Sequence, residues 1–202
     1  MSAIDPVDAR VRVLDAAELL FAVKGFDSVT LRDIASSIGL THAALYYHFP
    51  GGKEELFAEV MERNIRRHGA GLASSMEAGG VSLRGKLRGA AFWLLSQPPM
   101  DLIRMAETDL KALSPVAARR LMDLVYLLML KRLQDAIAAA RDSGEVGPCD
   151  PGLLAGGILG LVESLHSVPV TIVGRDRYAM ACELLDVLLK GIEYKGDTHA
   201  GS

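Results

Sequence analysis

The chain has 202 residues and a formal net charge of −3, which suits one or two ordinary domains and excludes a uniformly basic nucleic-acid coat. Hydrophobic residues make up 50% of it and aromatic residues 5%, a composition that favours packed helices over a β-sandwich. Its cysteines, Cys149 and Cys182, are too few for a disulfide framework or a zinc cluster, and its uncharged runs are shorter than the roughly 18 residues of a membrane span. We therefore expect a cytoplasmic protein with no metal, no cofactor and no membrane segment.

Apolar residues recur with the helical period along almost the whole chain, and capping residues, glycines and prolines divide this pattern into about nine helices. The predicted helices, in chain order, lie at about 7–24, 31–38, 42–49, 53–75, 82–97, 102–113, 115–141, 151–168 and 176–193. Thr30 is the expected N-cap of the second helix, with Asp33 completing an imperfect capping box, and Gly39 ends that helix. The β-branched stretch 168–173 is interpreted as a helix end and loop. The predicted fold class is all-α.

Residues 31–50 contain the pattern that is most specific for a function. Two short helices joined by a tight turn need a small residue where they cross and a glycine at the turn, and Ala35 and Gly39 fill these places. An ordinary helical hairpin would also satisfy this spacing. The exposed side of the third helix favours DNA reading, because it carries hydroxyls, imidazoles and rings where a merely solvated face would carry Glu and Lys. These side chains are Thr41, His42, Tyr46, Tyr47 and His48.

Further short motifs stand in register with this pattern on both sides of it. They are Val13-Leu14-Asp15-Ala16-Ala17, Leu20-Phe21, Gly25-Phe26, Thr30, Ile34-Ala35, Gly39, Leu45-Tyr46-Tyr47-His48-Phe49 and Lys53-Glu54-Glu55-Leu56. Together they resemble the N-terminal domain of TetR-family transcriptional regulators over about residues 8–60. The family usually has one residue fewer between the Phe and the Lys, so Pro50-Gly51-Gly52 contains an insertion, which leaves the placement of Lys53 open.

The resemblance implies a three-helix, helix-turn-helix DNA-binding domain at 1–53 and a helical effector-binding and dimerisation domain at 54–202. It implies phosphate contacts from Thr30, Tyr46 and Lys53, and a base-reading surface formed by Thr41, His42, Ala43 and Tyr47. For two further residues the resemblance leaves two roles open. Arg32 contacts either a phosphate or a guanine edge, and His48 either contacts a phosphate or completes the small core.

The larger domain contains no catalytic motif, and the family implies that it binds a small effector. Adaptable or aromatic side chains, together with two polar ones in apolar surroundings, are candidates to line the pocket, although plain core is the alternative for each. These candidates are Trp93, Met100, Met105, Met122, Tyr126, Met129, Glu163 and His166.

A palindromic operator has two half-sites and needs two DNA-binding domains. One chain supplies a single such domain, so we expect a homodimer. The apolar stripes of the last two helices are the candidate interface, with intrachain core as the alternative. The stripes comprise Leu153, Leu154, Ile158, Leu161, Leu165, Met180, Leu184, Leu185, Val187 and Leu188.

These inferences predict a sequence-specific transcriptional regulator, a repressor released from a palindromic DNA operator by a small hydrophobic effector, and not an enzyme. The alternative is a helical protein that binds small lipophiles, or an enzyme, with no operator-specific DNA binding. An activator, or a regulator that docks on another protein, is also compatible with the sequence.

Overall fold

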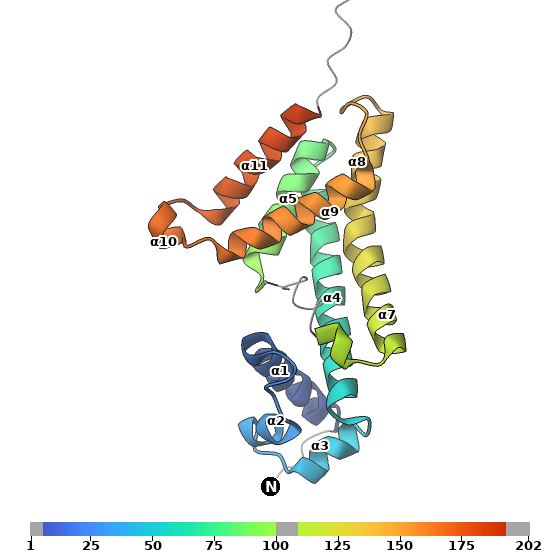
Figure 1. Cartoon of the computed structure of the whole chain (residues 1–202), viewed down its shortest axis with the longest axis vertical. Coiled ribbons are helices and arrows are strands. Elements are labelled where there is room, and N and C mark those ends of the chain that lie inside the picture. The colour runs from blue at the N-terminus through green and yellow to red at the C-terminus, as the bar shows by residue number, and fades with distance from the viewer. Residues whose placement is uncertain (1–5, 100–108, 193–202) are drawn as a thin grey trace, which may run out of the picture. The chain divides into compact units, whose positions relative to one another are not determined.

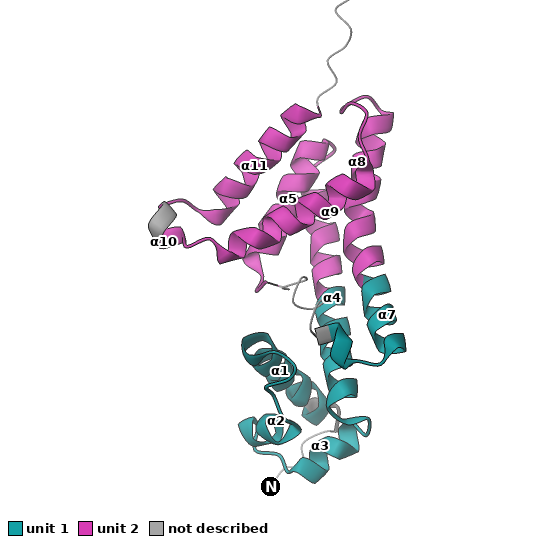
Figure 2. Cartoon of the chain, in the orientation of Figure 1, with its two compact units in different colours: residues 1–66, 102–124 teal, residues 67–101, 125–202 magenta. Residues whose placement is uncertain are grey.

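The structure, a computed structural model, describes residues 6–99 and 109–192, and every regular element in these two ranges is a helix (Figure 1). The all-α prediction is confirmed for this part of the chain. Two compact units divide the chain: unit 1 comprises residues 1–66 and 102–124, and unit 2 comprises residues 67–101 and 125–202 (Figure 2). Within the described residues, no helix is long and apolar enough to span a membrane.

Unit 1 contains the N-terminal helices and packs them on the first turns of a long helix. Its elements are α1 (Pro6–Lys24), α2 (Leu31–Ser37), α3 (His42–His48), the first part of α4 (Gly52–Ala78), the 3₁₀ turn η1 (Asp109–Ala112) and most of α7 (Pro115–Val125). Phe57 of α4 lies edge-on to Phe21 and Phe26, with ring centroids 5.0 and 4.9 Å apart. Because this shared aromatic core includes α4, unit 1 extends beyond residue 53. The predicted domains 1–53 and 54–202 stay a prediction.

Unit 2 contains the rest of α4 and the helices that cover it. These are α5 (Leu83–Ser96), the π-helical turn η2 (Tyr126–Leu130), α8 (Lys131–Asp142), α9 (Pro151–Ser164), the 3₁₀ turn η3 (Leu165–Ser167), α10 (Val170–Val173) and α11 (Arg177–Gly191). Helix α5 packs on α8, α9 and α11. Two of the helices begin at aspartate N-caps, since Asp150 accepts from Gly152 N at 2.8 Å and Asp176 from Ala179 N at 3.0 Å.

The helix ends differ from the prediction at three places. The rod predicted at 115–141 is interrupted by the π turn at 126–130. The helix predicted at 151–168 leaves α-helical geometry after Ser164, and Val168 is extended because it precedes Pro169. The stretch 168–173, interpreted as a helix end and loop, contains the short helix α10. Most of the helix predicted at 102–113 lies outside the described residues, and 109–112 is a 3₁₀ turn.

Candidate nucleic-acid interface

Helices α2 and α3 form the tight pair that the spacing predicts. Ala35 is 2% exposed at the packed side of α2, and its carbonyl accepts from Leu40 N at 2.9 Å. Gly39 has φ +70° in the turn, a conformation that residues with a Cβ rarely adopt. Leu45 and Phe49 are fully buried, so α3 is anchored by one side and presents the other to solvent.

Thr30 caps α2 in a complete capping box, where the sequence had indicated an imperfect one. Its Oγ1 accepts from Asp33 N at 3.1 Å, and Asp33 Oδ2 accepts from Thr30 N at 2.9 Å and from Thr30 Oγ1 at 2.6 Å. The side-chain and backbone hydrogen bonds from Thr30 lower the pKa of Asp33. The single hydroxyl proton of Thr30 is therefore already donated within the protein.

Replacing Thr30 with Ala removes this cap and leaves amide groups of the first turn of α2 without their acceptor. We expect a loss of about 1 kcal/mol in the free energy of unfolding, measured by urea denaturation. Thr30→Ser keeps the hydroxyl and is the matched control, expected to be close to wild type. Equal stability of the two variants would contradict a capping role for the hydroxyl.

The outer side of α3 carries the predicted base-reading residues. Thr41 is the N-cap of α3 and accepts from Ala44 N at 3.2 Å, so its hydroxyl proton is directed away from this bond. His42 and Ala43 are exposed on the first turn. Tyr47 is 81% exposed, and the half-buried His48 lies edge-on to it with ring centroids 5.3 Å apart. Polar and aromatic groups thus project from a helix whose opposite side is fixed in the core.

A cavity of about 400 Å³ in unit 1 brings together five of the predicted DNA-contacting residues. They are Thr30, Arg32, His42, Tyr46 and Lys53. The rings of His42 and Tyr46 meet edge-on with centroids 4.9 Å apart. An arginine, a lysine, an imidazole and a phenol around one concavity form a suitable environment for a phosphate group.

The insertion at 50–52 is accommodated by a glycine turn. Gly52 has φ +73° and donates from its N–H to Phe49 O at 2.9 Å, while Gly51 N donates to Glu55 Oε2 at 2.7 Å. Lys53 Nζ then donates to Phe26 O at 3.1 Å and lies 4.1 Å from the Phe26 ring centroid. Its ammonium group has three donors, so it can hold this carbonyl and a phosphate together.

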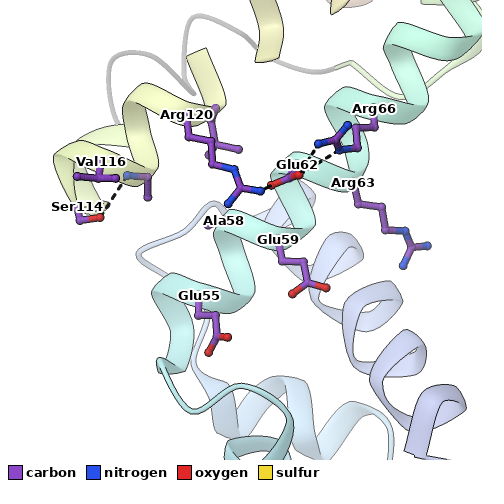
Figure 3. Close-up of a pocket in the computed structure, with 11 residues that line it drawn as sticks. Glu55, Ala58, Glu59, Glu62, Arg63, Arg66, Ser114, Val116 and Arg120 are labelled. Carbon is purple, nitrogen blue, oxygen red and sulfur yellow. Dashed lines mark hydrogen bonds and ion pairs between the residues drawn. The ribbon is translucent and has the colours of Figure 1, made fainter. Parts of the chain in front are cut away.

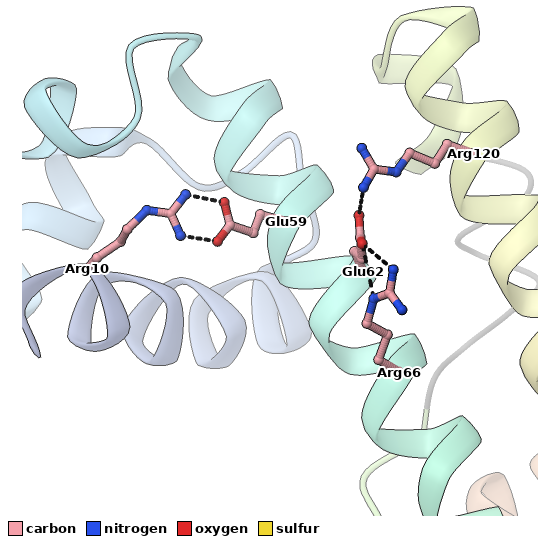
Figure 4. A network of polar contacts seen from close by, with 5 residues as sticks. All are labelled: Arg10, Glu59, Glu62, Arg66 and Arg120. Atoms are coloured by element: carbon pink, nitrogen blue, oxygen red, sulfur yellow. Dashed lines mark hydrogen bonds and ion pairs between the residues drawn. The ribbon is translucent and has the colours of Figure 1, made fainter. Parts of the chain in front are cut away.

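A larger cleft of about 780 Å³ lies in unit 1 between α4 and the start of α7 (Figure 3). Three of its charged side chains are paired with one another: Glu62 accepts from Arg66 at 2.8 Å and pairs with Arg120 at 2.8 Å (Figure 4). Partial burial acts to raise the pKa of Glu62, but these two arginines outweigh it, and the pKa lies below its ordinary value. Arg10 of α1 binds Glu59 through both of its terminal nitrogens (Figure 4).

These ion pairs tie α4 to its neighbours within unit 1. The cleft is lined by none of the predicted effector residues.

The predicted effector residues that the structure describes lie in both units and at both buried and exposed positions. Trp93, Tyr126, Met129, Glu163 and His166 belong to unit 2 and Met122 to unit 1, and Met100 and Met105 lie outside the described residues. Met129 is fully buried, whereas Met122 and Tyr126 are 41% and 47% exposed. Met122 and Tyr126 each come one position after a buried residue, Leu121 and Val125, and therefore lie off the buried stripe of this helix.

Sequence reasoning missed His68 of α4. It is 1% exposed, and neither ring nitrogen has a hydrogen-bond partner among the described residues. Burial, with the charges of Arg67 and His166, lowers the pKa of His68 to about 4. The signal was present: His68 stands three residues after Ile65 and four before Leu72, both fully buried, so it lies on the apolar stripe of α4.

Comparison with known proteins agrees with this architecture. Residues 13–60 match the sequence pattern of "Bacterial regulatory proteins, tetR family". The regulator LmrA of Bacillus subtilis strain 168 is 40% identical over 74 residues, which are 35% of this chain and 38% of LmrA. IcaR of Staphylococcus epidermidis, a negative regulator of the biofilm operon icaADBC, is 41% identical over 51 residues, 25% of this chain and 27% of IcaR. The chain thus matches well under half the length of either relative.

A solved structure extends the likeness of the fold beyond this region. AibR in complex with isovaleryl coenzyme A and operator DNA matches with a TM-score of 0.71 and 20% identity over 89% of this chain and 97% of AibR. The N-terminal region of the chain thus resembles that of the TetR family of bacterial transcriptional regulators.

Proposed function

We propose that this chain is a transcriptional repressor that binds a palindromic operator as a homodimer and leaves it when a small effector binds. The observation that carries the proposal is the outer side of α3. It is fixed by the fully buried Leu45 and Phe49 and presents Tyr47 with 81% of its surface exposed. A rigid helix with polar and aromatic side chains on its free face suits the major groove of B-form DNA.

The proposal divides the contacts between backbone and bases. Tyr46, Lys53 and Arg32 surround the 400 Å³ cavity and would hold a phosphate. Thr30 would join them only by releasing Asp33. The base-reading contacts come from Thr41, His42, Ala43 and Tyr47, and His48 either contacts a phosphate or supports Tyr47.

A homodimer is supported by the outer faces of the last two long helices. On α9, Leu153 is 75% exposed, and a Cβ added to Gly156, Gly157 or Gly160 would meet nothing within 4 Å. On α11, Val187 is 66% and Leu184 38% exposed. A second copy could approach these surfaces closely and bury their apolar groups. Other members of the predicted stripes, Ile158, Leu165 and Leu185, are buried within unit 2 and would not contribute.

The repressor and effector parts of the proposal draw on relatives. IcaR is named a negative regulator, and AibR has been solved with both an acyl-coenzyme A and its operator. A helical lipophile carrier without operator binding is the second candidate, and it predicts that no duplex is bound selectively.

The test begins with selection of bound duplexes from a random pool, followed by titration of single-base variants of the selected site. Tyr46→Phe is expected to weaken binding to all duplexes alike, up to about tenfold, because it removes one hydrogen bond to the backbone. His42→Ala is expected to relax preference at one base pair, a change of roughly 1–3 kcal/mol in discrimination.

Val23→Ala on the exposed side of α1 is the control and should bind as wild type. If the Tyr46 and His42 variants change binding equally across all duplexes, the division of contacts is wrong. If no duplex is selected, operator binding itself is wrong.

A further inference from the structure

His68 is a buried polar side chain without a hydrogen-bond partner among the described residues, which is rare in proteins. Its neighbours along the stripe of α4, Ile65 and Leu72, are fully buried and apolar. Both imidazole nitrogens lack a hydrogen-bond partner among the described residues. Buried polar groups are almost always paired, because an unmade hydrogen bond forfeits the interaction that water would have given. The side chain therefore has hydrogen-bonding capacity that the described chain leaves unused.

A second unused donor lies one turn further along α4. The Trp93 ring of α5 packs directly over Gly71, where an added Cβ would lie 2.0 Å from the indole. Trp93 Nε1 is buried and has no hydrogen-bond partner in the described part of the chain. His166 Nε2 lies 3.3 Å from the carbonyl oxygen of Leu94, the residue after Trp93, and its charge acts on His68. Polar groups from α4, α5 and η3 thus meet around one stretch of α4.

The π turn η2 packs on the same stretch of α4. A Cβ added to Gly69 would lie 2.7 Å from Leu128 Cβ, so η2 packs against the α4 backbone beside His68. π turns inside α-helices carry an extra residue and occur frequently at functional sites. A return of this turn to α-helical geometry would shift Leu128 and its neighbours on η2, which pack beside His68, and this shift would open the site without unfolding.

We propose that His68 and Trp93 are the polar recognition groups of a closed effector site in unit 2, and that this site takes an apolar molecule with an uncharged head group that accepts and donates hydrogen bonds, such as a carboxamide. This inference rests on the proposed effector binding and deepens it. A neutral imidazole offers one donor and one acceptor, and the indole offers a second donor. Three apolar residues adjoin these groups along the chain: Leu72 is one turn after His68, Leu94 follows Trp93, and Met129 follows Leu128. They are at most 1% exposed and suit an apolar tail.

We expect the head group to be uncharged, because neither His68 nor Trp93 carries a charge that could balance a charge on the ligand. Burial keeps His68 neutral at pH 7, since its pKa is about 4. An ionised carboxylate would lose its hydration on entering and gain no full counter-charge from these two side chains.

The experiment uses octanamide, octanoate and octane as probes that share one apolar chain. Trp93 is the one tryptophan in the sequence, so its fluorescence reports binding at the site. Octanamide is expected to shift the emission of wild-type protein and to bind roughly tenfold more tightly than octanoate or octane. His68→Leu should weaken octanamide binding roughly tenfold, and His68→Asn, which keeps a donor and an acceptor, should retain most of it.

Two controls separate loss of the site from loss of the fold. Val81→Ala, at a residue of unit 2 that is 93% exposed, should bind octanamide as wild type does. His68→Leu should melt at a temperature no lower than wild type, because it replaces an unpaired buried polar group with an apolar one.

Operator binding without any probe is measured in parallel and tests the proposed function independently. The inference is overturned if octanoate binds as tightly as octanamide, if His68→Leu binds octanamide like wild type, or if no probe binds at millimolar concentration. A water molecule that hydrogen-bonds His68 in a crystal structure and is displaced by no probe would also overturn it.

Discussion

Gly89→Ala is expected to destabilise unit 2 by about 1–3 kcal/mol, or more, although alanine is the better helix former. A Cβ at position 89 would lie 2.0 Å from the carbonyl oxygen of Ser75 and 3.4 Å from Met76 Cα. These atoms belong to the backbone of α4, so no change of side-chain rotamer relieves the overlap. Helices α4 and α5 would have to separate, and contacts along both would weaken.

Urea denaturation followed by Trp93 fluorescence measures this effect, because Trp93 lies on α5 one turn beyond Gly89. Gly191→Ala is the matched control, since an added Cβ there meets nothing within 4 Å. Its stability is expected to equal or slightly exceed that of wild type. A Gly89→Ala protein as stable as wild type would show that α4 and α5 do not approach as closely as described.

Acidification between pH 6.5 and pH 4 is expected to destabilise the protein through His68. The folded protein has a His68 pKa of about 4, against 6.5 for the ordinary side chain. In this interval His68 is protonated in the unfolded chain but mostly neutral in the folded chain. The free energy of unfolding therefore falls as pH falls. The contribution is fully present above pH 6.5, and its loss at pH 4 is roughly 3 kcal/mol.

Unfolding curves at several pH values, for wild type and His68→Leu, isolate this contribution. His166 also has a lowered pKa, caused first by burial, and acts in the same direction, so the variant should lose only part of the slope. Glu62 and Asp33 also have lowered pKa values, through their hydrogen bonds and ion pairs, so they too destabilise the folded protein when acid protonates them. Parallel curves for the two proteins between pH 6.5 and pH 5 would rule out a buried neutral His68.

Local patterns predicted much of the fold and of the candidate interface. Thr30, Asp150 and Asp176 cap the helices that follow them, and Gly39 takes the left-handed conformation that ends α2. Caps and turns depend on residues within about four positions, which is why they can be recognised from the sequence alone. The same short range explains why the residues on the outer face of α3, a helix of seven residues, could be chosen from the sequence.

Other features of the interface depend on distant parts of the chain. The sequence left the placement of Lys53 open, and the structure directs it to Phe26, 27 residues away. The hydroxyl proton of Thr30 is committed to Asp33, which spacing alone does not reveal. The glycine turn that absorbs the insertion depends on Glu55, whose carboxylate accepts from Gly51 N.

Among the candidate effector residues, composition did not distinguish buried positions from exposed ones. The residue type alone does not show whether a methionine lies in the core, as Met129 does, or on the surface, as Met122 does. His68 stood on an apolar stripe but became informative only when its two ring nitrogens proved to lack partners among the described residues.

By itself, the sequence determined the order of the helices, their caps, the helix-turn-helix pair and the resemblance of residues 13–60 to a known family, because each follows from side chains close together along the chain. Only the tertiary structure decided which face of each stripe is buried, where Lys53 reaches and which polar groups are enclosed without a partner. Those outcomes depend on which helices pack on one another. The packing of helices is fixed by shape and hydrogen bonding between residues far apart in the sequence, and the helical period carries no information about such pairs.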